Sequence, residues 1–135
     1  MNRLAQAGIF CIVMGVMTLF LGVFPFAVNQ NATPNIGLAQ ILTMLTGLTL
    51  VVMGSYCVVF ALVHRGRPRN LLRDIGVRLG MTGLVISIAS ALADVMGVGS
   101  HSSSSLVFGF VQGLGMLAGF LIAMGGVFIY AIARQ

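Results

Sequence analysis

The chain has 135 residues, of which 59% are hydrophobic and 7% are charged, and its mean hydropathy is +1.08. A water-soluble domain carries about 25% charged residues, so the composition excludes that class and indicates a chain dissolved in lipid. The net charge of +5 comes from arginines at the ends of apolar runs, not from a basic surface interleaved with aromatic side chains, so we expect no nucleic-acid partner.

Four apolar runs each reach the roughly 20 residues that an α-helix needs to cross a bilayer. They are Leu4–Val28, Leu38–Val63, Val77–Val98 and Leu106–Ala133. Backbone groups in lipid must be paired within their own segment, and the runs lack the alternation of membrane strands, so helices follow. Short connections make successive helices antiparallel neighbours. We therefore predict an all-α membrane protein: one domain, 1–135, with four transmembrane helices in an up-down-up-down bundle.

The first run carries glycine at every seventh position, at Gly8, Gly15 and Gly22. This spacing places the three glycines close to one stripe of a helix, where small residues let two helix backbones approach closely. The run also holds Cys11, and the second run holds Cys57. The two thiols lie at similar predicted depths, but buried cysteines are usually inert, so we predict no metal site.

The connection between the second and third runs holds most of the arginines: Arg65, Arg67, Arg69, Arg73 and Arg78. Arg3 precedes the first run and Arg134 follows the fourth, whereas the first and third connections contain no lysine or arginine. The positive-inside rule therefore places both termini and the middle connection in the cytoplasm. The rule alone accounts for these five arginines; the alternative is a docking patch for anionic lipid or an acidic partner.

The third run and the residue before it carry three glycines near one face, Gly76, Gly80 and Gly83. The same run holds the only acidic residue inside an apolar run, Asp94. Asp94 lies about 25 Å along the helix from Val77, near the outer boundary of a hydrocarbon layer about 30 Å thick. We expect a solvated or hydrogen-bonded helix end. The alternatives are a proton or ion site formed with His101 in the serine-rich third connection, or a contact to a partner subunit.

The fourth run contains two GxxxG pairs, Gly109 with Gly113 and Gly115 with Gly119, which are typical of close helix packing. The second run adds a stripe of threonines, which either bond across helices or line a narrow hydrated path. These are Thr43, Thr46 and Thr49.

We predict no enzyme, because the chain has only two carboxylates, on opposite sides of the membrane, and these cannot form an acid–base pair in one subunit. His64 and His101 also lie on opposite sides, which disfavours haem ligation. The first hypothesis is a small non-catalytic accessory subunit of a larger complex in a bacterial inner membrane, packed through its glycine-rich faces and without a cofactor other than bound lipid. The alternatives are a homo-oligomeric transporter or channel that uses Asp94, and a lipid- or quinone-binding helper.

Overall fold

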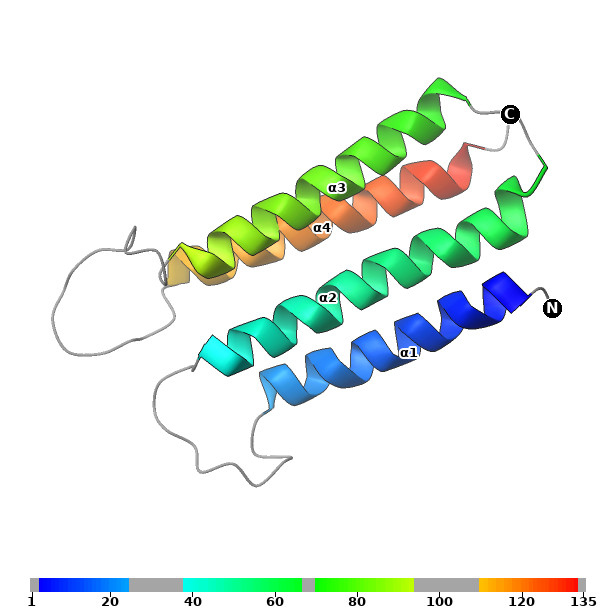
Figure 1. Ribbon diagram of the computed structural model, residues 1–135. Helices are drawn as coiled ribbons and strands as arrows, with labels where there is room; N and C mark the ends of the chain where they lie inside the picture. The colour runs from blue at the N-terminus through cyan, green and yellow to red at the C-terminus, as the bar shows by residue number, and fades with distance from the viewer. Residues whose placement is uncertain (1–2, 25–37, 67–69, 94–109, 134–135) are drawn as a thin grey trace, which may run out of the picture.

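A computed structural model describes residues 3–24, 38–66, 70–93 and 110–133, and this part of the chain is helical apart from a few residues at the helix ends (Figure 1). Its α-helices are α1 (Arg3–Val23), α2 (Leu38–Val59), α3 (Leu71–Leu92) and α4 (Phe110–Ile132). All four are long and apolar enough to cross a membrane. The prediction of an all-helical chain with four helices able to span a membrane is thus confirmed for these residues.

The helix ends differ from the ends of the apolar runs, most of all in α3. This helix begins at Leu71, earlier than the start expected near Val77. Asn70 has extended backbone angles, and its carbonyl accepts hydrogen bonds from the amides of Arg73 at 3.0 Å and Asp74 at 3.2 Å. Hydropathy shows where a chain becomes apolar, but a helix continues past that point for as long as its backbone groups find partners.

The first tightly packed pair consists of α1 and α2, which run antiparallel (Figure 1). Gly8 of α1 faces Gly54 of α2, and Gly15 faces Gly47. A Cβ atom built on Gly15 would lie 2.8 Å from both the Gly47 oxygen and the Val51 nitrogen, closer than real Cβ atoms come. The two backbones therefore touch at positions where any side chain would hold them apart.

The second tightly packed pair is α3 with α4, and glycine again stands at the contact. Gly83 faces Gly119, and a Cβ on Gly76 would lie 2.8 Å from the nitrogen of Tyr130. The Ser87 hydroxyl adds a hydrogen bond of 3.0 Å to the carbonyl of Met116. The same geometrical solution, contact between bare backbones of antiparallel helices, thus occurs twice in the chain.

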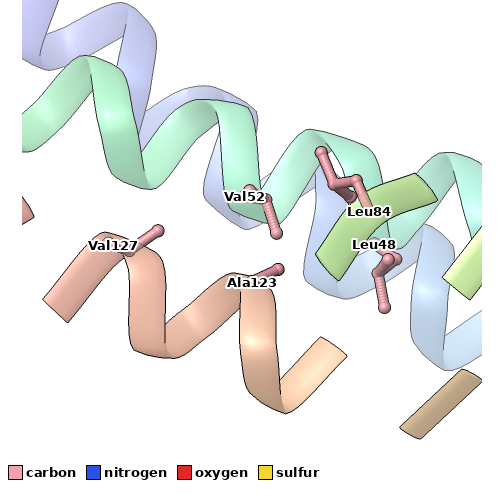
Figure 2. Packing of buried hydrophobic residues seen from close by; sticks show 5 residues of the cluster. All are labelled: Leu48, Val52, Leu84, Ala123 and Val127. Atoms are coloured by element: carbon pink, nitrogen blue, oxygen red, sulfur yellow. The ribbon is translucent and has the colours of Figure 1, made fainter. Parts of the chain in front are cut away.

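The two pairs meet through α2, which packs against α3 and α4 (Figure 1). An apolar core fills this contact, with Leu48 and Val52 from α2 pointing towards the residues of the other pair (Figure 2). Those residues are Leu84 from α3 and Ala123 and Val127 from α4. This core depends on side chains that interdigitate, whereas glycine dominates the contact inside each pair.

α2 ends in a π-helical turn, Phe60–His64, labelled η2 here. A π turn contains one residue more than an α turn and so shifts the direction of the side chains that follow it. His64 is buried at the end of this turn, while the next residues, Arg65 and Gly66, are exposed. Gly66 has a φ of 82°, a left-handed conformation that glycine adopts without steric cost and that commonly follows a helix end.

Two neighbouring glycines of α4 provide a direct test of the backbone contact. A Cβ on Gly126 would meet the backbone of Gly80, whereas a Cβ on Gly125 has nothing within 4 Å. We expect Gly126→Ala to lower the free energy of unfolding by about 1–3 kcal/mol, because the added methyl group overpacks the contact. Gly125→Ala should be neutral or stabilising, since alanine is favoured over glycine in a helix by about 1 kcal/mol.

The unfolding midpoint in SDS, followed by tyrosine fluorescence, measures both variants, because the chain has two tyrosines and no tryptophan. Equal midpoints for Gly125→Ala and Gly126→Ala would contradict the backbone contact.

Candidate functional site

Four side chains from separate elements gather at one end of the bundle: Tyr56 (α2), His64 (η2), Arg73 (α3) and Tyr130 (α4). We refer to them as the Tyr130 cluster. The antiparallel order brings the end of α2, the start of α3 and the end of α4 to the same end of the molecule (Figure 1).

Tyr130 is the centre of the cluster and is only 7% exposed. The imidazole of His64 is stacked on its ring, with centroids 4.6 Å apart and planes inclined by 8°. The ring of Tyr56 meets it edge-on at 5.2 Å, and the guanidinium carbon of Arg73 lies 5.8 Å from its centroid. One aromatic ring thus contacts an imidazole, a second ring and a cation, and the cation–π contact stabilises the guanidinium in this position.

Two hydrogen bonds tie the cluster to the backbone of the α3–α4 pair. The hydroxyl of Tyr56 donates to the carbonyl of Gly76 at 2.8 Å. His64 Nε2 lies 3.1 Å from the carbonyl of Ala133, which can only accept, so Nε2 carries the proton in this contact. The end of α2 is therefore held to the start of α3 and to the end of α4.

A pocket of about 390 Å³ opens beside the cluster, and we call it the arginine pocket. It is lined by Phe60, Arg73, Asp74, Val77, Arg78 and Tyr130. An apolar groove of about 380 Å³ adjoins it, and we call this the α2–α3 groove. The two cavities share Phe60, Val77 and Tyr130, so charged and apolar surfaces are continuous at this end of the molecule.

The structure separates the arginines that the sequence placed in one patch. Arg73 is only 6% exposed and lies over Tyr130, while Arg78 is exposed and lines the same pocket. Arg65 is exposed just after η2 and does not belong to the lining. Arg67 and Arg69 lie outside the described residues.

The glycines expected at helix contacts lie as follows. Three of them face α2: Gly8, Gly15 and Gly22. Three stand between α3 and α4: Gly76, Gly83 and Gly119. Gly80 faces the hydroxyl of Tyr56, and Gly115 faces Ser90. Gly113 is half-buried, and Gly109 lies outside the described residues. Among the glycines predicted at helix contacts, each one with a described neighbour thus faces another helix of this same chain.

Two sets of polar groups were expected near a transport path, and the structure describes only one of them. Asp94 and His101 both lie outside the described residues. The threonine stripe is described, and its hydroxyls donate within their own helix: Thr43 to Ala39 at 2.8 Å, Thr46 to Leu42 at 2.7 Å and Thr49 to Thr46 at 2.9 Å. Their hydrogen-bond donors are therefore used by the backbone of α2.

The cysteines Cys11 and Cys57 are free thiols and half-buried. Within the described ranges, no three histidine, cysteine or acidic side chains come close enough together to hold a metal ion.

The sequence pattern predicts no site at Tyr56, His64 or Tyr130. The arginine pattern predicts that the second and fourth runs end on one side of the membrane, and this prediction was the available signal. The arginine pattern does not predict the π turn, which changes the direction of the His64 side chain at the end of α2. A hydropathy pattern does not encode a single extra residue in a helical turn.

The ring of Tyr130 can be tested separately from its hydroxyl. We expect Tyr130→Leu to lower the free energy of unfolding by about 2–3 kcal/mol, because it removes two aromatic contacts and a cation–π contact. Tyr130→Phe keeps the ring and should lie within about 0.5 kcal/mol of the parent protein. Thermal unfolding in mild detergent, reported by a thiol-reactive dye on Cys11 and Cys57, measures both, and equal losses would show that the ring contacts are not the stabilising feature.

Comparison with known proteins provides no relative from which a role could be transferred. The chain matches no family model, and no curated protein or solved structure is significantly similar to it. A function for this chain therefore has to be derived from its own residues.

Proposed function

We propose that the chain is a non-catalytic accessory subunit of a larger assembly in a bacterial inner membrane. Its four helices form an up-down-up-down bundle, with both termini and the arginine-rich middle connection in the cytoplasm. The observation that supports this proposal most directly is the uncovered apolar face of α1.

α1 is the least covered of the candidate spans. Residues buried inside the protein make up 17% of its most apolar stretch, against 28–33% in the other three. Its glycine face is taken up by α2, while large side chains at helical spacing, such as Phe10, Val13 and Met17, are about half exposed or more. In lipid, helices associate through van der Waals packing of shape-matched surfaces, so this face is suited to a helix of another subunit.

The polar side chains inside the spans support a structural role over a catalytic or conducting one. The threonine stripe is bonded to its own helix, whereas three other polar side chains link neighbouring helices. Gln40 of α2 donates to the carbonyl of Gly22 in α1 at 2.7 Å, and Ser87 and Tyr56 make the cross-helix bonds described above. In the membrane such bonds contribute about 0.6 kcal/mol each on average, which suits helices that need to be fixed relative to one another.

The subunit proposal is tested by site-specific photo-crosslinking in intact membranes. A photoreactive amino acid replaces Met17, which is 61% exposed on α1, and in a control protein it replaces Val52, which is fully buried in the core. We expect the Met17 probe to form an adduct of defined mass with an unlike membrane protein, and the Val52 probe to react only within the chain. Adducts between two copies of this chain would instead support the homo-oligomeric transporter or channel.

The orientation is tested with single cysteines in a background of Cys11→Ala and Cys57→Ala. We expect Ser103→Cys and Gln30→Cys to react with a membrane-impermeant maleimide added to intact cells, because the connections without arginine face away from the cytoplasm. Gln135→Cys should react only after the cells are opened. Labelling of Ser103→Cys and Gln135→Cys from the same side would contradict the proposed topology.

A further inference from the structure

We propose that the arginine pocket and the α2–α3 groove together bind one anionic phospholipid from the leaflet in which they lie. The phosphate would sit against Arg73 and Arg78, and one acyl chain would lie in the groove. This site does not depend on whether the chain is a subunit of a larger assembly.

The shape of the cavity fits an amphiphile that is charged at one end. The arginine pocket opens at the end of the bundle, and the groove continues from it between α2 and α3, with Phe60, Val77 and Tyr130 forming the shared wall. Beyond that wall the groove is lined by apolar side chains such as Val52, Met81 and Leu84. From Arg73 to Leu84 the helix rises about 16 Å, roughly half of a hydrocarbon layer about 30 Å thick, which is the depth of one leaflet.

The charges of the pocket match a singly charged phosphodiester. Arg73 and Arg78 carry two positive charges and Asp74 one negative charge, so the charged lining sums to +1. A planar guanidinium binds phosphate through parallel charge-assisted hydrogen bonds. Asp74 disfavours a headgroup with further negative charge, so we assign a lipid of net charge −1, such as a phosphatidylglycerol.

The packing of Arg73 makes it suited to this role. The contact with Tyr130 holds its guanidinium beside the pocket, so less side-chain freedom is lost when a phosphate binds. Arg73 and Asp74 also stand in the first turn of α3, where the helix dipole contributes a partial positive potential. Arg78 lies one turn further along α3 and is exposed, so it can close over a headgroup that arrives from the lipid surface.

The site is tested by native mass spectrometry of the full chain released from nanodiscs that contain equal amounts of phosphatidylglycerol and phosphatidylcholine. We expect one retained phosphatidylglycerol per chain, and about tenfold less retention in Arg78→Gln, because a charge-assisted hydrogen bond is lost. Arg65→Gln is the matched control: it removes the same charge from an exposed arginine outside the pocket and should retain the lipid. Asp74→Asn should increase retention, because the pocket then carries a charge of +2.

A variant of the groove tests the acyl-chain half of the proposal. Met81→Trp fills the groove without changing any charge, and we expect it to reduce retention as well. The unfolding midpoint in SDS, followed by tyrosine fluorescence in the charge variants and by tryptophan fluorescence in Met81→Trp, confirms that each variant is folded before its bound lipid is measured. Equal loss in Arg65→Gln and Arg78→Gln, equal retention of phosphatidylcholine, or full retention in Met81→Trp would each overturn the site.

Discussion

The contact of bare helix backbones at glycine is the constraint on which the rest of this structure depends. The hydrophobic effect does not drive helices together inside a bilayer, so the favourable free energy of helix association has to come from close packing. Gly15 against Gly47, and Gly83 against Gly119, let the main chains of antiparallel helices meet where a single methyl group would separate them. Large side chains are thereby left for the outer faces and for the contact between the two helix pairs.

The two helix pairs are joined in a different way, and unevenly along their length. An apolar core around Val52 and Ala123 lies in the contact, while the hydrogen bonds of Tyr56 and His64 to the α3–α4 pair both lie at the end that holds the Tyr130 cluster. Side-chain packing therefore acts along the interface, and directional polar contacts fix one end of it. The same end carries Arg73 and the pocket, so the best-fixed part of the interface coincides with the candidate lipid site.

The four helices could be predicted from the sequence, because the length of an apolar run encodes a helix directly. The helix that each glycine contacts could not be predicted, because spacing describes one helix and does not identify the helix opposite. In the structure Gly8 of α1 meets Gly54 of α2, and Gly76 of α3 meets Gly126 of α4. The arginine pocket could be predicted from the sequence only in part. The arginine run predicted a topology signal, with an anion-binding surface only as the alternative. The burial of Arg73 over Tyr130 depends on how α3 packs against α4, and the direction of the His64 side chain depends on a π turn. Asp94 and His101 stay predictions.

The pairing of neighbours along the chain has a consequence for how the protein is made. Each tightly packed pair consists of helices that are synthesised one directly after the other, α1 with α2 and α3 with α4. Contacts between nearby parts of a chain form quickly, because little loop entropy is lost when they close. The first helical hairpin can therefore leave the insertion machinery as a closed unit before the second is translated, so that the last step of assembly is the docking of two finished halves rather than the threading of four separate helices.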